Sequence, residues 1–306
     1  MTSHVALSVL DQTPVPHGST AADAVAQTLA LARAADRLGY RRYWLAEHHD
    51  TISLAGTAPE VLVAAVAAAT TSLRVGSGGV LLPYYSPLKV AEVFRMLHTL
   101  YPVRIDLCLG RAAGAGPAAE AALLASGGAS GDGRFAEHLA DLLGFLDGRL
   151  GDDHPYAGVR AMPTEVRGTE PDEAGGPAVW LLGSSSHSSA AAAAFGLSFA
   201  FAHFITPDFG PQIVAGYRKR FRPPAQGAAR AQAGVIEAPQ LAVAVAVMCA
   251  DSDAEAERHA STTDLWRLGP EGPDRRPILP AEAVAAHAWT DLERTKAAQN
   301  RSKVVV

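Results

Sequence analysis

Tyr43-Trp44-Leu45-Ala46-Glu47-His48-His49-Asp50 joins a run of aromatic and aliphatic side chains directly to a carboxylate and two imidazoles. Its first half is typical of a buried β-strand, so the sequence predicts a core strand that delivers a titratable cluster to the mouth of a barrel. Histidine has the unperturbed side-chain pKa nearest neutrality. Glu47, His48 and His49 are therefore candidates for proton handling or for stabilising an anion. The alternative interpretation is an ordinary strand end with polar residues.

A metal site is a further alternative for this cluster, and strand geometry disfavours it. Successive strand residues point to opposite faces, so His48 and His49 cannot easily share one ion. The only cysteines, Cys108 and Cys249, each lie inside an apolar run and form no CxxC or Cys/His spacing. We therefore predict no metal ion, and two buried thiols in a reducing compartment.

The length and composition of the chain indicate a globular protein with a large core. It has 306 residues, of which 48% are hydrophobic and 19% charged, and this composition excludes wholesale disorder. We assign residues 1–306 to a single domain, because α/β barrels of this length commonly form one. A formal net charge of −5 without a long basic run argues against nucleic acid as a partner.

Neither the N-terminus nor any apolar run predicts contact with a membrane. Met1-Thr2-Ser3-His4 lacks a basic region followed by an apolar one, and the apolar runs stay shorter than a membrane span. We therefore expect a cytoplasmic protein.

Apolar strand-like runs alternate with helical patterns along most of the chain. The expected strands are residues 5–10, 42–46, 73–82, 104–109, 179–182, 197–202 and 241–249. The expected helices are residues 21–38, 59–70, 87–100, 135–150, 188–195 and 211–221, followed by one that begins at Asp251. Because each strand is apolar on both faces, the alternation predicts a parallel sheet with crossover helices.

A (β/α)₈ TIM barrel explains this order better than an open doubly wound sheet. The units in series are too many for a common open sheet, and the first strand is followed by Asp11-Gln12-Thr13-Pro14 instead of a G-x-G-x-x-G turn. In either fold the site lies at the C-terminal ends of the strands. Those ends hold Asp11 and Gln12, Glu47 to Asp50, Gly78 to Leu82, Arg111, Gly183 to Ser189 and His203.

Gly183-Ser184-Ser185-Ser186-His187-Ser188-Ser189, here named the serine loop, joins the fifth strand to a helix. Hydroxyls and free backbone N–H groups at a helix N-terminus can bind an anion, and Ser184, Ser185 and Ser188 are the candidates. Arg111, at the end of the preceding strand, could reach the same anion, and phosphate is the predicted guest. A serine-rich helix cap is the alternative. A serine hydrolase has less support, because the loop lacks the G-x-S-x-G elbow.

Three glycines in four positions occupy the strand Gly76-Ser77-Gly78-Gly79-Val80-Leu81-Leu82-Pro83. Glycines in a strand weaken its packing and increase the entropy lost on folding, so their presence here needs an explanation. One explanation is that the backbone approaches a ring system closely or adopts a rare peptide geometry. A β-bulge is the other. The run Val80-Leu81-Leu82 offers an apolar wall, with Tyr84, Tyr85 and Phe204 expected nearby, and it predicts a hydrophobic or aromatic substrate.

Together these stretches resemble the bacterial luciferase-like flavin-dependent monooxygenase family over nearly the whole chain, and most closely its single-subunit oxidoreductases. The resemblance is carried by Asp11 to Pro14, Trp44 to His49, Arg74 to Pro83, Arg104 to Arg111 and Leu182 to Leu197. It implies a (β/α)₈ barrel that binds reduced FMN (FMNH₂) and reacts it with O₂ through a C4a-(hydro)peroxyflavin. It also implies a separate NAD(P)H-dependent flavin reductase as a partner, and we expect a homodimer.

The resemblance also assigns roles to residues. His48 matches the catalytic imidazole of the family, and we expect Glu47 and His49 to orient or support it. Arg111 and the serine loop, through Ser185 and Ser188, match the ligands of the flavin phosphate. A non-prolyl cis peptide falls on Gly78-Gly79, under the isoalloxazine ring, where two glycines relieve the side-chain crowding of such a bond.

The sequence departs from the family pattern in two places, and these affect what we expect of its activity and of barrel closure. The luciferase cysteine that tunes the flavin intermediate aligns with Gly110, so light emission from an aldehyde is not assumed. Relatives continue beyond Val306 through a further helix and the last barrel strand. We therefore expect either the complete barrel or a barrel that lacks its last βα unit.

Two other functions remain as alternatives on the same fold. An F420-dependent oxidoreductase would need more basic residues around the mouth than the sequence offers. A non-catalytic flavin-binding accessory protein is disfavoured by His48. The high Ala, Gly and Arg content is typical of GC-rich bacterial genomes, where such enzymes often serve secondary metabolism, including antibiotic biosynthesis.

Overall fold

The computed structural model describes residues 5–111, 116–125, 134–148, 150–164, 176–223, 236–269 and 275–306. The strands of its main sheet are β1 (Ser8–Asp11), β2 (Arg42–Leu45), β3 (Arg74–Ser77), β4 (Val80–Leu81), β5 (Ile105–Gly110), β6 (Ala178–Gly183), β7 (Ser198–Ala202) and β8 (Leu241–Ala244). The helices between them are α1 (Ala21–Arg37), α2 (Pro59–Ala69), η1 (Leu82–Tyr84), α3 (Pro87–Leu100), α4 (Pro117–Leu124), α5 (Phe135–Asp147), α6 (Ser186–Ala194) and α7 (Gly210–Arg220). The predicted alternation of strands and helices is confirmed.

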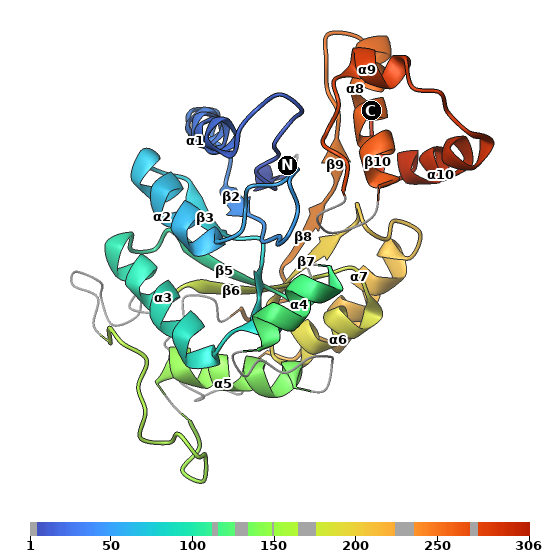
Figure 1. Cartoon of the computed structure of the whole chain (residues 1–306). Helices are drawn as coiled ribbons and strands as arrows, with labels where there is room; N and C mark the ends of the chain where they lie inside the picture. The colour runs from blue at the N-terminus through green and yellow to red at the C-terminus, as the bar shows by residue number, and fades with distance from the viewer. Residues whose placement is uncertain are drawn as a thin grey trace.

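The strands form one parallel sheet in the order β1-β2-β3-β5-β6-β7-β8, with the short β4 paired to β5. Figure 1 shows the helices along the outer side of this sheet, which curls into a nearly closed barrel. The predicted α/β barrel is therefore confirmed. Among the described strands, β1 and β8 form the two edges and do not pair with each other. This is the form expected of a barrel without its last βα unit.

The core lies on both faces of the sheet, because successive strand residues point to opposite sides. Tyr43 and Leu45 of β2 point outward and are fully buried against the helices. Trp44, Cys108 and Trp180 point into the barrel. The rings of Trp44 and Trp180 meet edge to face with centroids 5.2 Å apart. Since Trp44 belongs to β2 and Trp180 to β6, this contact spans the barrel interior.

One buried carboxylate joins three neighbouring strands near their N-terminal ends. Asp106 of β5 is fully buried, accepts a hydrogen bond from Trp44 Nε1 (3.0 Å) and forms ion pairs with Arg42 (3.0 Å) and Arg74 (2.6 Å). Two guanidinium groups thus compensate a charge that would be costly to bury alone. Gly76 makes room for this arrangement, because a Cβ there would lie 2.3 Å from the Asp106 carbonyl oxygen.

After β8 the chain leaves the barrel. Its remaining elements are β9 (Ala246–Val247), α8 (Asp253–Arg267), α9 (Ala281–Ala285), α10 (Asp291–Arg301) and β10 (Val304–Val305). Strands β9 and β10 pair in a separate two-stranded sheet, and Figure 1 shows this group set apart from the barrel body. The prediction of one strand over residues 241–249 is therefore wrong beyond Ala244, and Cys249 is exposed instead of buried. No described strand pairs with the outer edge of β8, so the following residues are not held in the main sheet.

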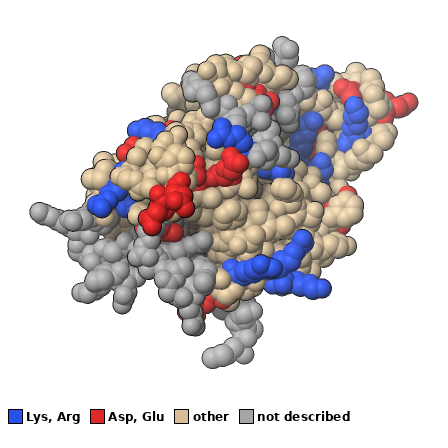
Figure 2. Space-filling view, turned by 90° about the horizontal axis from the view of Figure 1, so that it is seen from below, with Lys and Arg blue, Asp and Glu red and all other residues tan. Residues whose placement is uncertain are grey.

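Two surface properties of the described residues bear on partners. None of their helices is both long and apolar enough to cross a bilayer. On the face shown in Figure 2, lysine and arginine side chains form small groups separated by uncharged surface, and acidic side chains form compact groups of their own. The charged side chains visible on this face therefore form small separate groups.

Candidate active site

The predicted site residues lie at one edge of the sheet, where the C-terminal ends of parallel strands meet. Glu47, His48 and His49 follow β2, Gly78 and Gly79 lie between β3 and β4, Arg111 follows β5, and the serine loop begins at the end of β6. The register keeps these ends level, because Leu45 lies opposite Ser77 and Leu109 opposite Leu181. The fold therefore gathers at one mouth residues that lie far apart in the sequence.

Glu47 is a buried carboxylate that connects the end of β2 to β4. Only 4% of the residue is exposed. Its Oε2 accepts a hydrogen bond from the Leu81 backbone N–H (3.0 Å), and its Oε1 accepts one from the Tyr85 hydroxyl (2.7 Å) and lies 2.8 Å from His49 Nε2. Burial and the Glu47 charge raise the pKa of Tyr85. Glu47 therefore orients His49 and the backbone of β4.

His48 differs from its neighbour, because no carboxylate in the described part of the chain forms a hydrogen bond with its ring. The backbone N–H of His48 donates to the Gly56 carbonyl (2.8 Å), while its ring Nδ1 is buried without a hydrogen-bond partner among the described residues. Burial and, to a smaller extent, the positive charges of Arg275 and His49 together lower the pKa of this imidazole to about 4, while the Glu47 charge opposes them. The ring is therefore neutral near pH 7. A buried polar atom without a partner costs about 1–3 kcal/mol, which a ligand at the mouth could recover.

Two more strand ends carry buried polar atoms without a partner among the described residues: the Tyr84 hydroxyl and Nδ1 of His203. Tyr84 follows β4, and its ring stands edge-on to His49 with centroids 6.5 Å apart. Burial, followed by the charge of Glu120, raises the pKa of Tyr84. His203 follows β7 and stands edge-on to Phe201. The sequence predicts Tyr84 beside the apolar wall and His203 at a strand end, but only the structure shows that each has an unsatisfied polar atom.

The peptide between Gly78 and Gly79 is cis, as the family resemblance predicts. A Cβ on Gly78 would lie 2.5 Å from Leu10 Cδ1, and one on Gly79 would lie 2.6 Å from the Cys108 carbonyl oxygen. The protein's own atoms therefore fill the space beside these glycines, which differs from the expectation that a ring needs that space. Gly78 and Gly79 therefore offer a ligand their backbone atoms.

The predicted apolar wall is only partly present. Val80 and Leu82 pack into the core between sheet and helices, because alternate residues of this segment turn outward. Leu81 belongs to neither core cluster and is buried beside Gly110, where a Cβ would lie 3.2 Å from Leu81 Cδ2. The wall is therefore reduced to Leu81.

The serine loop caps helix α6. Ser185 is the N-cap residue, and its Oγ accepts a hydrogen bond from the Ser188 backbone N–H (3.2 Å) and lies 3.1 Å from Ser188 Oγ. A Cβ on Gly183 would lie 2.3 Å from Ser188 Cβ, so glycine lets the first turn of α6 close onto the end of β6. Arg111 and Gly183 each lie two residues beyond the paired Leu109 and Leu181. The cationic residue and the capped helix thus stand at neighbouring strand ends, the arrangement that suits an anion.

The C-terminal part of the chain packs over the loops that follow β1 and β2. Trp266 Nε1 donates a hydrogen bond to the hydroxyl of the buried Ser53 (3.0 Å), and the His17 backbone N–H donates to the Ile278 carbonyl (2.8 Å). Arg275 lies with its guanidinium carbon 3.9 Å from the centroid of the Trp266 ring. The sequence gave no signal for these residues, because they come from the end of a helix and from an irregular segment.

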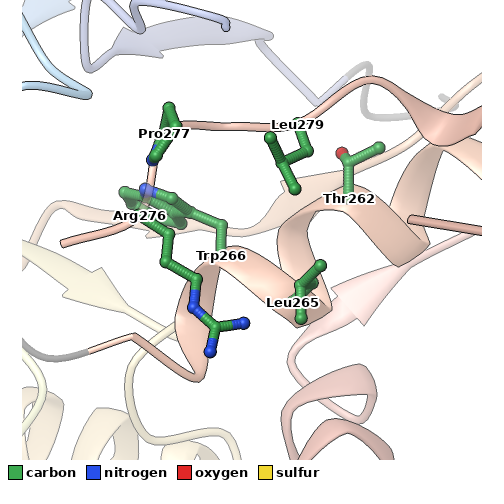
Figure 3. A pocket seen from close by; sticks show the side chains of 6 residues that line it. All are labelled: Thr262, Leu265, Trp266, Arg276, Pro277 and Leu279. Carbon is green, nitrogen blue, oxygen red and sulfur yellow. The ribbon is translucent and has the colours of Figure 1, made fainter. Parts of the chain in front are cut away.

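A shallow crevice with an empty volume of about 160 Å³ lies between α8 and residues 276–279. Figure 3 shows the side chains that line it, including Leu265 and Trp266 from the helix and Pro277 and Leu279 from the segment above. The crevice belongs to the packing of the C-terminal part. In the part of the chain that the structure describes, no group of three or more His, Cys, Asp or Glu side chains is arranged to hold a metal ion.

Comparison with known families matches residues 5–303 to the model of the luciferase-like monooxygenases. The uncharacterised protein YwcH of Bacillus subtilis is 42% identical over 99% of this chain and 86% of its own length. The N-acetyl-S-alkylcysteine monooxygenase of the same bacterium is 38% identical over 83% of this chain and 71% of its own length.

Solved structures share the barrel. Apo-MsnO8 superposes with a TM-score of 0.78 and 39% identity over 99% of this chain and 92% of its own. Two distant structures, similar in fold alone, have a TM-score of 0.59 each. One is the oxygenating constituent of 3,6-diketocamphane monooxygenase from Pseudomonas putida in complex with FMN (19% identity, covering 83% of this chain and 70% of its own). The other is the F420-dependent tetrahydromethanopterin reductase from Methanopyrus kandleri (11% identity, covering 88% of this chain and 74% of its own). With a family match over nearly its whole length, this chain belongs to the luciferase-like monooxygenase family of oxidoreductases.

Proposed function

We propose that the protein is a monooxygenase that uses reduced FMN and O₂ to oxygenate a hydrophobic or aromatic small molecule. The proposal is carried by the partly buried His48 imidazole, whose lowered pKa keeps it neutral near pH 7. Its Nδ1 has no partner among the described residues. His48 lies at the same edge of the sheet as the Gly78-Gly79 backbone and the serine loop. A separate NAD(P)H-dependent reductase supplies the reduced flavin in this proposal, and the protein acts as a homodimer.

The proposed phosphate site consists of Arg111 and the N-terminus of α6. A helix N-terminus presents backbone N–H groups and a positive dipole end to an anion, and Ser185 and Ser188 add two hydroxyls. The guanidinium of Arg111 can pair with two phosphate oxygens at once. These residues fit a terminal phosphate better than an uncharged group.

The proposed ring site lies between the Gly78-Gly79 backbone and His48. When bound there, reduced FMN supplies the two electrons needed to activate O₂. Leu81 gives the site one apolar side chain. The unpartnered polar atoms of His48, Tyr84 and His203 leave hydrogen-bonding capacity for a flavin or substrate.

His48 is proposed to move a proton at Nδ1. The low pKa keeps the ring neutral at neutral pH, so Nδ1 can accept a proton from the substrate or hold a hydrogen bond to the cofactor. Its burial excludes water from that nitrogen, and water would compete for the same bond. Glu47 and His49 are proposed to support His48 through their charge and through the backbone that they hold in place.

The test is a stopped-flow experiment in which protein and reduced FMN, mixed anaerobically, meet buffer containing O₂. We expect flavin reoxidation to pass through a long-lived absorbing species that free reduced FMN does not give. The proposal would be contradicted if the reoxidation time course matched that of free flavin at protein concentrations where anaerobic titration shows binding.

His48→Gln tests the proposed role of the imidazole. This variant should bind reduced FMN nearly as well as the wild type but should shorten the lifetime of the absorbing species. His154→Gln is the matched control, because its ring pairs with Asp141 (3.1 Å) away from the strand edge. An unchanged lifetime in His48→Gln would remove the residue from the mechanism.

The choice of cofactor has its own test, because F420-dependent enzymes use the same barrel. Anaerobic titration of the protein with FMN and with F420 compares the two affinities. We expect FMN to bind more tightly, since its single phosphate needs only Arg111 and the serine loop. Tighter binding of F420, with a reaction that consumes no O₂, would favour the dehydrogenase function instead.

The organic substrate is proposed to be a small hydrophobic molecule of secondary metabolism. Leu81 is the buried apolar side chain at the mouth, and the Tyr84 and His203 rings add aromatic surface with one polar atom each. Such a site suits a substrate that is mostly apolar.

A further inference from the structure

Glu47 and His49 form a carboxylate–imidazole pair at the mouth of the barrel. Glu47 Oε1 lies 2.8 Å from His49 Nε2, and the side chains are 1% and 15% exposed, respectively. The same oxygen accepts a hydrogen bond from the Tyr85 hydroxyl (2.7 Å), and Oε2 accepts one from the Leu81 backbone N–H (3.0 Å). Other parts of the fold therefore hold both carboxylate oxygens in place beside the His49 ring.

These contacts decide which nitrogen of His49 carries the proton when the ring is neutral. Burial and the Glu47 charge raise the pKa of Tyr85, so its hydroxyl keeps its proton and donates it to the hydrogen bond. The carboxylate oxygen then acts as an acceptor toward both of its neighbours. His49 Nε2 therefore donates an N–H to Glu47, and the lone pair of the neutral ring lies on Nδ1.

His49 Nδ1 is accessible to a ligand. It forms no hydrogen bond within the described part of the chain, and it is not one of the buried polar atoms that lack a partner there. His48 Nδ1, by contrast, is one of those buried atoms. Of the two imidazoles, His49 thus has the free nitrogen that both a substrate and the solvent can reach.

His154 shows how a carboxylate-paired histidine differs when both of its nitrogens are used. Its Nε2 lies 3.1 Å from Asp141 Oδ1, and the two side chains are 25% and 26% exposed. Its Nδ1 accepts a hydrogen bond from the Tyr156 backbone N–H (3.2 Å). His154 therefore has no nitrogen left to exchange a proton. His49 has the same kind of carboxylate support but keeps Nδ1 free.

Two neighbours make the surroundings of His49 suitable for an apolar molecule with a polar group. Tyr84 stands edge-on to the His49 ring, with the ring centroids 6.5 Å apart, and its buried hydroxyl has no partner among the described residues. Leu81 holds Glu47 through its backbone and adds a buried apolar side chain. An unused buried donor is costly, so a ligand that accepts a hydrogen bond would stabilise this arrangement.

We propose that His49 is a general base for the organic substrate, whose acidic O–H group gives its proton to Nδ1 while Glu47 compensates the charge that the ring acquires. The proposal rests on the monooxygenase function proposed above and narrows its substrates to hydrophobic phenols. In this step the O–H bond breaks, its electron pair stays on the substrate oxygen, and the proton forms the Nδ1–H bond. Of the two roles proposed for His48, the hydrogen bond to the cofactor then remains.

The charge of the pair selects phenols among oxygen acids. A carboxylic acid is already ionised at neutral pH, and the Glu47 carboxylate would repel it. An aliphatic alcohol is too weak an acid for an imidazole. A phenol, with an ordinary pKa of about 10 like that of tyrosine, arrives neutral and can still lose its proton to a base that is stabilised by a carboxylate.

The experiment records the visible spectrum of 4-nitrophenol bound to the whole protein without flavin. At a pH below the pKa of the free probe, most of the free probe is neutral, so a phenolate band reports proton transfer to the protein. We expect the ratio of phenolate to phenol to be about tenfold higher in the bound probe, because charge-assisted hydrogen bonds stabilise the ion pair. 4-Nitroanisole, the methyl ether, has no proton to give and should show no such change.

His49→Gln should bind the probe as neutral phenol and lose the phenolate band. Glu47→Gln keeps the shape of the side chain without its charge and should give an intermediate ratio. His154→Gln is the matched control and should keep the wild-type ratio, because its ring pairs with Asp141 away from the mouth. Thermal melts report whether each variant is folded, and Glu47→Gln carries the comparison if His49→Gln is unfolded.

A second measurement locates the proton on the His49 ring. Long-range ¹H–¹⁵N correlation by NMR, with His49 assigned by its absence in His49→Gln, should show the neutral ring protonated on Nε2. A proton on Nδ1 would overturn the proposal, because the free nitrogen would then be a donor.

Three spectral results would also overturn it: the wild type binds no probe, the bound probe is no more ionised than the free one, or the phenolate band persists in His49→Gln. In the last case, loss of the band in His48→Gln would assign the base to His48. Neither measurement needs flavin, so their failure is separate from failure of the monooxygenase function. An ionised probe in a protein that leaves flavin reoxidation unaltered would keep the base and refute the monooxygenase.

Discussion

Two adjacent histidines of identical chemistry have different surroundings at this mouth. His49 lies 2.8 Å from the Glu47 carboxylate, whereas His48 has an unpartnered ring nitrogen within the described structure and a lowered pKa. Both residues lie beyond the end of β2 at Leu45, so the strand alternation that the sequence predicts does not extend to them. The Glu47 carboxylate that meets His49 is held by Leu81 of β4 and by Tyr85, which follows η1.

The lowered pKa of His48 predicts a specific loss of stability in acid. The ordinary pKa of 6.5 falls to about 4 in the folded protein, so between these values the unfolded chain binds more protons. The stability is present above pH 6.5 and is lost as the pH falls to about 4. In chemical denaturation across this window, the free energy of unfolding of His48→Gln should decline less than that of the wild type, by up to about 3 kcal/mol. Equal declines in both proteins would contradict the assignment.

At the scale of elements, the glycines show how strand ends and helix starts are fitted together. Gly76 admits Asp106, Gly78 admits Leu10 and Trp44, and Gly183 admits Ser188. The sequence shows that these positions need a small residue. It does not show whether protein or ligand fills the space, because the neighbours come from other strands or, for Gly183, from the first turn of α6. At all three positions the answer is protein.

Gly183→Ala tests the junction between β6 and α6. The new Cβ would lie 2.3 Å from Ser188 Cβ, so the first turn of α6 must move away from the strand end. We expect a destabilisation of about 1–3 kcal/mol in urea unfolding and weaker FMN binding. Gly151→Ala is the control, because nothing lies within 4 Å of its Cβ position. Wild-type stability and FMN affinity in Gly183→Ala would show that the loop tolerates the shift.

At the scale of the whole molecule, the C-terminal part completes the mouth of a barrel whose described strands leave an opening between β1 and β8. Helix α8 contributes Trp266, and the segment after it contributes Arg275 and Ile278, which reach the loops after β1 and β2. The ion pairs of Arg301 with Glu257 and Asp264 join α10 to α8. The C-terminal part is thus attached to the mouth by few, specific contacts.

Trp266→Ala tests this attachment. The change removes the hydrogen bond to the buried Ser53 hydroxyl, which keeps its contact with the Thr51 hydroxyl (3.1 Å), and it removes the ring under Arg275. In hydrogen–deuterium exchange we expect faster exchange in α8 and residues 275–280 than in the wild type, with β2 and β5 unchanged. Trp266→Phe keeps most of the ring and should show a smaller effect. Uniform acceleration across the barrel strands would mean that Trp266 supports the whole fold.

The sequence by itself determined the order of strands and helices, the parallel barrel and the strand ends where chemistry gathers. These follow from hydrophobic period, glycine placement and local caps, which act over a few residues. Only the tertiary structure decided that the run beyond Ala244 leaves the barrel, that Glu47 orients His49, and that Trp266 reaches Ser53. Each of these depends on burial and charge contributed by residues distant in the chain, and no local pattern encodes such contacts. The stretch from Tyr43 to Asp50 thus predicted a candidate site, and the rest of the molecule decided the burial and the charged neighbours of its residues.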